Sequence, residues 1–254
     1  MKKFFVNLVC AFIFSKKKRD IVRRKLLHQN AKVMCNQWDI FSQNNHIEIC
    51  EEDKTHINLS IQGKGNTVLI KKLCSGITGK INISLAGNNC RIIIDEGVWV
   101  SGFLNIGAGQ IHPNFGAINN TSIFIGKKTS FETCNITLFN SNSVLEIGEQ
   151  CMFSFGINIF HTDAHPIYNL DKTKILNKVK TLKIGNHTWV GANVSILKNC
   201  IIPDDCIIGW GSVVSSKSCI DLDAHCALSG NPAVVVKRNV TWDSDGSKGY
   251  IQNI

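Results

Sequence analysis

The sequence lacks the cysteine patterns of metal-binding and disulfide-bonded proteins. Its eleven cysteines are scattered through 254 residues, their number is odd, and no two are separated by just two residues. The scatter argues against zinc ribbons, which need closely spaced cysteine pairs, and against a framework of paired disulfides. We therefore expect a reducing cytoplasmic setting, in which most cysteines are small buried residues.

The sequence also lacks an N-terminal hydrophobic run long enough to cross a bilayer. The apolar run covers only residues 4–14, whereas a membrane-spanning helix needs about 20 residues. The basic stretch KKKR follows directly, where a secretory signal would have a small-residue cleavage site. The pattern predicts a basic amphipathic helical segment within residues 1–45, with peripheral contact to the inner face of the cytoplasmic membrane through residues 1–32. The alternative is a helix that packs on the body of the protein with a solvated charged face.

Outside that segment the chain carries no net charge. Ten of the 28 Lys and Arg residues lie in residues 1–32, but only one of the 19 Asp and Glu residues, so 18 of each sign remain. The formal charge of +9 therefore belongs to the N-terminal segment. A neutral body argues against a broad basic groove, and we expect no nucleic-acid partner.

What the sequence does have is a six-residue repeat. Neither the 3.6-residue period of a helix nor the two-residue period of a plain strand produces it. The repeat predicts short strands joined by tight corners, with each column of side chains stacked on itself, so that neighbouring layers need one another for burial. Every sixth position holds an aliphatic residue or cysteine, in the series Ile184, Val190, Ile196, Ile202, Ile208, Val214, Ile220 and Cys226.

Upstream, the repeat continues in a degenerate form as paired aliphatic residues with irregular spacing. The pairs are Leu59/Ile61, Val68/Ile70, Ile81/Ile83, Ile92/Ile94, Leu104/Ile106, Ile123/Ile125 and Leu145/Ile147. We therefore predict one solenoid over residues 46–231 and a C-terminal tail over residues 232–254. One coil starts at Ile147 and the next at Ile184, so a loop at about residues 165–183 must leave the solenoid.

Titratable side chains gather where this loop begins, in the stretch FHTDAHPIYNL of residues 160–170. In an extended chain His161, Asp163 and His165 would share one face, because side chains alternate along a strand. A corner between them would break that alternation. The stretch is the strongest candidate for a catalytic site.

The repeat resembles that of the hexapeptide-repeat left-handed β-helix acyltransferases, and this resemblance implies an all-β fold, a left-handed parallel β-helix. The stretch TDAHPI resembles the Ser/Thr-Asp-x-His-x-Ile element of bacterial cell-surface polysaccharide O-acetyltransferases in that family. The resemblance implies that His165 is the catalytic base. Asp163 matches the element, although it could equally cap the local turn. His161 stands where the element has no fixed residue type and is a third catalytic candidate.

Two further stretches resemble the family's acetyl-CoA-binding elements. IGNHTWVGANVSIL, from Ile184, is similar to its IGxxxWIGxxxxIL run, and GNPAVVVKR, from Gly230, is similar to the terminator of its helix, with Val234 in place of the usual lysine. The alternative for the tryptophan of the first stretch is a cap on the outer wall. The donor-binding residues implied are Trp189, Gly191, Ala192, Gly209, Asn231, Pro232, Lys237 and Arg238.

The resemblance implies transfer of an acetyl group from acetyl-CoA to a hydroxyl of a cell-surface sugar, such as capsule, lipooligosaccharide, O-antigen or sialic acid. It implies direct attack, a homotrimer with coenzyme A bound between protomers, and no metal. Three alternatives stay open. One is a non-catalytic scaffold at the membrane that recruits polysaccharide-assembly proteins and binds no acetyl-CoA. Another is N-acetylation of an amino sugar nucleotide. The third is a metal-dependent hydratase of the γ-type carbonic anhydrase kind, for which His161, His165 and His187 would be the zinc ligands.

Overall fold

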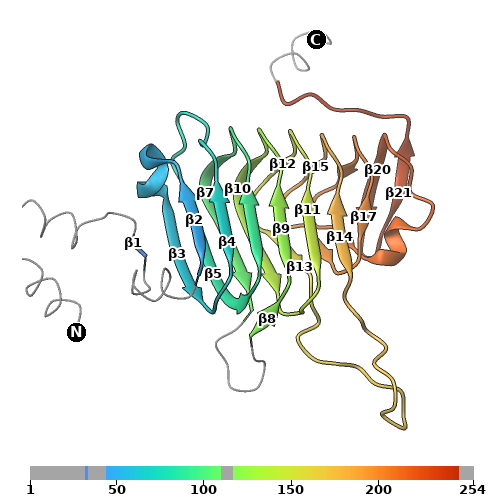
Figure 1. Cartoon of the computed structure of the whole chain (residues 1–254). Helices are drawn as coiled ribbons and strands as arrows, with labels where there is room; N and C mark the ends of the chain where they lie inside the picture. Colours follow the sequence, from blue (N-terminus) through green and yellow to red (C-terminus); the bar gives the residue numbers. More distant parts are fainter. Residues whose placement is uncertain (1–31, 34–43, 110–116, 246–254) are drawn as a thin grey trace, which may run out of the picture.

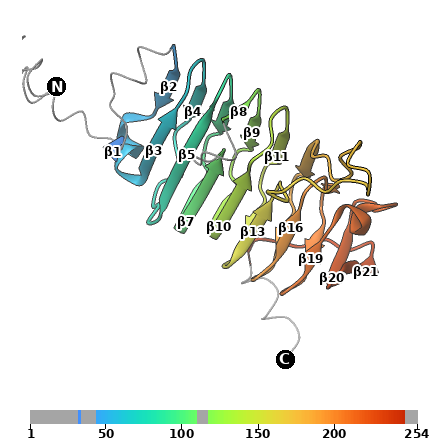
Figure 2. The ribbon, with the colours of Figure 1, turned by 90° about the horizontal axis from the view of Figure 1, so that it is seen from below.

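The computed structural model describes residues 32–33, 44–109 and 117–245, and these residues form a parallel β-helix (Figure 1). Each complete coil passes over three faces of a prism. Among the described residues, every strand pair is parallel except the last, β20 with β21, which is antiparallel. The coils follow one another along a single axis (Figure 2).

The first face is a seven-stranded sheet. Its strands, in order along the helix, are β2 (His46–Ile49), β4 (Thr67–Ile70), β6 (Arg91–Ile94), β9 (Ser122–Ile125), β11 (Val144–Ile147), β14 (Thr181–Ile184) and β17 (Ile201–Ile202).

The second and third faces belong to one 14-stranded sheet, because its long strands bend around an edge of the prism. The strand β10, for example, pairs with β12 near its start and with β13 near its end. The early strands of this sheet are β1 (Lys32–Val33), β3 (Ile57–Gln62), β5 (Lys80–Asn88), β7 (Trp99–Ala108), β8 (Ile118–Asn119) and β10 (Ser130–Leu138). Later coils have separate strands: β12 (Met152–Phe153), β15 (Trp189–Val190), β18 (Ile207–Ile208), β20 (Cys226–Gly230) and β21 (Ala233–Arg238) on the second face, and β13 (Ile157–Phe160), β16 (Ser195–Leu197) and β19 (Val213–Val214) on the third.

The repeated aliphatic residues form the core inside the prism. All the upstream aliphatic pairs are buried, as are seven of the eight residues in the six-residue series, which confirms the repeat as a packing pattern. Ile220 is the exception and is 67% exposed. It follows the short 3-10 helix η2 (Ser216–Cys219), where a capping box between Ser215 and Ser218 holds the backbone in a turn instead of a strand. The other 3-10 helix, η1 (Glu51–His56), leads into β3.

A ladder of asparagines on the outer side of the third face holds the coils in register. Each side-chain amide donates to the amide oxygen of the next asparagine along the axis, over 2.7 to 3.3 Å. A slip of one residue would turn every rung toward the core, so the ladder disfavours other registers. The ladder ends in β13, the strand that leads into the loop. Its members are Asn58, Asn82, Asn105, Asn135 and Asn158.

A loop runs from the end of β13 at Phe160 to the start of β14 at Thr181 (Figure 1). The strand β1 pairs with β3 upstream of the predicted solenoid, and β21 extends the sheet beyond residue 231. The predicted amphipathic helix and its membrane contact fall mainly on residues 1–31 and 34–43, which lie outside the described residues, and they stay predictions. In the described ranges no helix is long and apolar enough to cross a membrane.

Candidate active site

The two histidines of the loop entrance point to different sides of the wall. The backbone turns between them at Ala164, which has a φ of +60° and donates its N–H to Thr162 Oγ1 over 2.9 Å. This corner interrupts the alternation expected for an extended chain. His161 is 0% exposed, whereas His165 is exposed on the outer surface. The structure therefore does not bring His161 and His165 onto one face.

The buried position of His161 favours its neutral form. Burial lowers the pKa of its imidazole to about 4, because a charged ring would lose its hydration. Neither ring nitrogen has a hydrogen-bond partner among the described residues. A ring enclosed in this way has no open path to a substrate, so its position suits packing beneath the loop.

His165 is fixed through its backbone by the two halves of the loop. Its N–H donates to the backbone carbonyl of Asp163 over 2.6 Å. Its own carbonyl accepts a hydrogen bond from Asn177 Nδ2 over 2.9 Å, and Asn177 Oδ1 accepts the N–H of Ile167 over 2.7 Å. Asn177 lies on the returning half of the loop, so it ties the two halves together around His165.

Asp163 links the same loop to the next coil. Its carboxylate accepts a hydrogen bond from Asn177 Nδ2 over 2.7 Å and forms an ion pair with Lys198. Partial burial alone would raise the pKa of Asp163, but the hydrogen bonds from Lys198 and Asn177 outweigh it and hold the pKa below its ordinary value. The carboxylate therefore stays ionised and braces the loop.

A pocket of about 370 Å³ lies beside His165, at the edge where the chain passes from the third face to the first. The pocket lies between the loop and the corner of the preceding coil. Its lining residues are Asn140, Ser141, Asn142, Asp163, Ala164, His165, Pro166, Ile175, Asn177, Lys178 and Val179.

The loop that forms this pocket is locally basic although the body of the protein is neutral. Four exposed lysines lie between Asn169 and Thr181, against the single carboxylate of Asp171. None of the four forms an ion pair with a carboxylate in the described part of the chain. They are Lys172, Lys174, Lys178 and Lys180.

The residues implied in acetyl-CoA binding lie on the second face and its two edges. Trp189 starts β15 at the first-to-second edge and is 37% exposed. Lys237 is exposed on β21 and makes no ion pair among the described residues, whereas Arg238 pairs with Asp223 over 2.9 Å. An accessible indole and an accessible ammonium on one face suit a ligand that carries both an aromatic base and phosphates, so these residues fit coenzyme A.

The remaining donor candidates lie at the second-to-third edge. A Cβ added to Gly191 would lie 2.9 Å from the Ile208 carbonyl oxygen, and one added to Gly209 would lie 2.9 Å from Ser229 Oγ. Both glycines thus allow successive coils to stack closely. Ala192 is buried, and the exposed Asn231–Pro232 pair forms the tip of the β20–β21 hairpin with a cis peptide bond.

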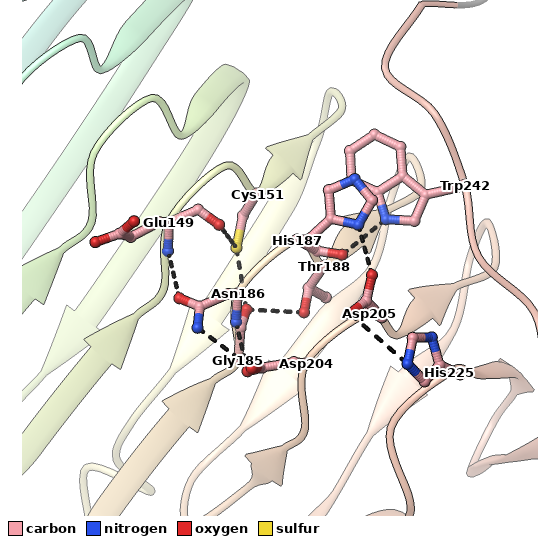
Figure 3. A network of polar contacts seen from close by, with 10 residues as sticks. All are labelled: Glu149, Cys151, Gly185, Asn186, His187, Thr188, Asp204, Asp205, His225 and Trp242. Atoms are coloured by element: carbon pink, nitrogen blue, oxygen red, sulfur yellow. Dashed lines mark hydrogen bonds and ion pairs between the residues drawn. The ribbon is translucent and has the colours of Figure 1, made fainter.

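Trp189 has an aromatic neighbour that the sequence analysis did not identify. Trp242, from the C-terminal tail, lies 6.0 Å from Trp189 between ring centroids and stacks on His187 at 4.4 Å with an interplanar angle of 8°. Its indole N–H donates to the His187 carbonyl over 2.8 Å (Figure 3). The tail has no repeat, and the position of its tryptophan relative to the coils depends on how the chain turns after β21.

Within one chain, the candidate base and the candidate donor site lie on different edges. His165 lies after β13, at the edge between the third and first faces, and Trp189 lies after β14, at the edge between the first and second faces. The ligand set of the hydratase alternative is also separated: His187 lies near Trp189 and bonds Asp205 over 2.7 Å, and His161 is enclosed in the core. Within the described ranges no three His, Cys, Asp or Glu side chains form a metal-binding group.

The buried thiols are poorly suited to act as nucleophiles. Burial raises the pKa of Cys134 well above its usual range, and it raises the pKa values of Cys151 and Cys206 to about 11. Since the thiolate is the reactive form, these three thiols are inert near neutral pH.

Comparison with known proteins identifies the family. Residues 182–220 match the family model described as bacterial transferase hexapeptide (six repeats). The chain is 32% identical over 208 residues to a polysialic acid O-acetyltransferase of Neisseria meningitidis, covering 82% of this chain and 88% of that protein. Two solved structures are also similar. The polysialic acid O-acetyltransferase OatWY has 27% identity and a TM-score of 0.56, over 83% of this chain and 95% of that one. The polySia-specific acetyltransferase NeuO has 26% identity and a TM-score of 0.55, over 74% of this chain and 89% of that one.

These similarities and the coiled parallel architecture agree, and they confirm the predicted left-handed β-helix and acetyltransferase activity. The chain belongs to the hexapeptide-repeat left-handed β-helix acyltransferases and, within them, to the O-acetyltransferases that modify bacterial cell-surface polysaccharides.

Proposed function

We propose that this protein transfers the acetyl group of acetyl-CoA to a hydroxyl of an anionic surface polysaccharide of the polysialic acid type, with His165 as the general base. The observation that carries the proposal is the position of His165, which is exposed in a pocket and fixed by its backbone. The pocket volume of about 370 Å³ lies in the range of small-ligand sites and suits a sugar residue.

The lining of the pocket supports a sugar acceptor. The exposed side chains of Ser141 and Asn142 offer hydroxyl and amide groups that match sugar hydroxyls as donors and acceptors. The four lysines of the loop suit a polymer that carries a carboxylate on every unit, because several weak attractions add along the chain. The similar enzymes named above are described as acting on polysialic acid, which is a polymer of this kind.

The reaction needs a group that removes one proton from the acceptor hydroxyl. Bound acetyl-CoA supplies an activated acetyl thioester. The imidazole of His165 accepts the hydroxyl proton while the sugar oxygen forms its bond to the carbonyl carbon. The carbon–sulfur bond breaks, and His165 returns the proton to the sulfur, so that an acetyl ester and a free thiol leave the enzyme. Asp163 and Asn177 orient the histidine through the loop backbone.

The donor would be held on the second face. Trp189 would pack against it and Lys237 would attract its phosphates, while Arg238 would donate to the same phosphates from beside its partner Asp223. Gly191, Ala192, Gly209, Asn231 and Pro232 would form the close backbone contacts along the second-to-third edge.

A complete site then requires a second copy of the chain. His165 and Trp189 lie on different edges of one prism, so acceptor and donor meet only if the His165 edge of one protomer lies against the Trp189 edge of another. In a closed ring of three copies, one contact repeated three times places the His165 edge of each protomer against the Trp189 edge of the next. This requirement supports a homotrimer with the donor bound between protomers.

Incubation of the full chain with acetyl-CoA and polysialic acid tests this function. We expect a mass gain of about 42 Da for each acetyl group added (the mass of C₂H₂O) and its release by mild base, because an ester is base-labile and an amide is not. A neutral polysaccharide of similar length should be acetylated little, because it carries no negative charges for the lysines of the loop to attract. Acetylation only of an amino sugar nucleotide, with a base-stable product, would favour the N-acetyltransferase alternative.

A further inference from the structure

The C-terminal tail folds back over the edge that carries Trp189. After β21 the chain returns along the coils (Figure 1), where the N–H of Val240 donates to the His225 carbonyl over 3.0 Å. Trp242 then lies half-buried on the first-to-second edge. The tail thus reaches back to the coil that contains the candidate donor tryptophan.

Two contacts with His187 fix Trp242 there. Its ring lies nearly parallel to the imidazole, and its indole N–H donates to the backbone carbonyl of the same residue. The stacking fixes the plane of the indole, and the hydrogen bond fixes its rotation within that plane. A side chain held in both ways has one orientation toward Trp189, at 6.0 Å and 41°.

The imidazole under this stack is itself held in place. His187 Nδ1 bonds Asp205 Oδ1 over 2.7 Å, and Asp205 Oδ2 lies 4.0 Å from His225 Nε2 (Figure 3). These three residues occupy successive corners of the same edge. The tail tryptophan therefore rests on a polar network that spans three coils.

If Trp242 served only to anchor the C-terminal tail, it would not need to lie beside Trp189. The centroid of the Trp189 ring lies 6.0 Å from that of Trp242, and the Trp189 side chain is still 37% exposed. An unsupported tryptophan at the start of a two-residue strand would sample several rotamers, and ordering it on binding would cost free energy. A fixed neighbour removes part of that cost before the ligand arrives.

We propose that Trp242 is a positioning residue for the acetyl donor: it holds the indole of Trp189 in its binding orientation. The inference rests on the proposed donor site at Trp189 and assigns a role in that site to the C-terminal tail. Trp242 acts through Trp189, so its removal should weaken donor binding and leave acceptor binding unchanged.

The test compares full-length Trp242→Ala and Trp242→Phe with Trp189→Ala and with a matched control, Trp99→Ala. Trp99 occupies the same outward column three coils upstream, through the pairs with Ser130 and Met152, and its indole N–H also donates to a backbone carbonyl, that of Gly76, over 3.3 Å. The measurements are the Kd of coenzyme A by calorimetry, the KM values of both substrates, and the melting temperature.

We expect Trp242→Ala to raise the Kd of coenzyme A and the KM of acetyl-CoA about 2- to 12-fold, the equilibrium equivalent of one aromatic pair. Trp242→Phe keeps the stacking and loses the hydrogen bond, so its Kd should lie between those of Trp242→Ala and the unchanged enzyme. The KM of the acceptor should stay constant in both, and Trp99→Ala should bind coenzyme A normally.

A normal Kd in Trp242→Ala, with a raised Kd in Trp189→Ala, would overturn this inference and leave the proposed donor site intact. A normal Kd in both variants would instead reject the donor site. If Trp242→Ala does not fold, the Kd of Trp242→Phe is the deciding measurement. A Kd of Trp242→Phe for coenzyme A equal to that of the unchanged enzyme would overturn the inference.

Discussion

The side-chain amide of Asn177 donates to the backbone carbonyl of His165 over 2.9 Å. Two further hydrogen bonds of the same amide group reach Asp163 and Ile167, so one side chain closes the base of the loop. Removal of the Asn177 side chain should leave the His165 imidazole in place but poorly oriented.

Asn177→Ala should therefore lower kcat about 10- to 100-fold, because small displacements of a catalytic group are costly, with the Kd of coenzyme A unchanged. Asn169→Ala is the matched control: that asparagine bonds Thr173 and Lys174 within the loop, away from His165. Equal kcat values for Asn177→Ala and the unchanged enzyme would show that the loop positions His165 without this amide.

The buried His161 should make the protein sensitive to acid. Its pKa is about 4 in the folded protein and about 6.5 in the unfolded chain, so below pH 6.5 protons bind the unfolded state preferentially. The contribution of His161 to the free energy of unfolding is complete above pH 6.5, falls as the pH drops toward 4, and is constant below that. The total decrease in the free energy of unfolding is on the order of 3 kcal/mol.

His161→Phe should remove this pH dependence while keeping a ring of similar size in the core. Urea unfolding at pH 7, 6, 5 and 4 would measure it, with the difference between the variant and the unchanged protein growing in favour of the variant as the pH falls. A constant difference across this range would contradict the burial of a neutral imidazole at this position.

The coils were predictable because burial repeats with the same period as the sequence. Ile184, Val190 and Ile196 each lie on a different face of one coil and all point inward. Ile220 fits the period and is exposed, because the serine capping box competes with the strand locally. A periodic pattern gives no information about such local competition.

The site was only partly predictable, because side-chain direction depends on single backbone torsions. The positive φ of Ala164 turns His161 inward and leaves His165 outside, and no feature of an alanine indicates that conformation. The contact between Trp242 and His187 joins residues 55 positions apart through the path of the tail, which carries no repeat. Contacts of this kind depend on tertiary structure.

The lysines of the loop should make acceptor binding sensitive to salt. Lys178→Ala removes the lysine that lines the pocket and should raise the KM of polysialic acid up to about fivefold at low salt, with a smaller effect at high salt. Lys64→Ala, an exposed lysine at a distant coil corner, is the control. A KM for polysialic acid that is unaffected by both Lys178→Ala and salt would argue against an anionic acceptor at this loop.

The separation of His165 and Trp189 predicts complementation between inactive subunits. Mixed trimers of His165→Ala and Trp189→Ala chains, formed by co-expression, should regain activity, because some interfaces combine an intact His165 edge with an intact Trp189 edge. At an acetyl-CoA concentration well below the raised KM of Trp189→Ala, each variant alone should show little activity. Mixed assemblies without activity, or light scattering that reports only monomers, would mean that the site is not shared.

The central claim is that His165 removes the acceptor proton, and kcat of His165→Ala tests it most directly. Loss of a positioned general base should lower the rate of acetyl transfer about 100- to 10,000-fold while the Kd of coenzyme A stays close to that of the unchanged enzyme. His46→Ala, which removes an exposed histidine in β2, should keep full activity. Near-normal acetyl transfer to polysialic acid by a folded His165→Ala variant would contradict the assignment.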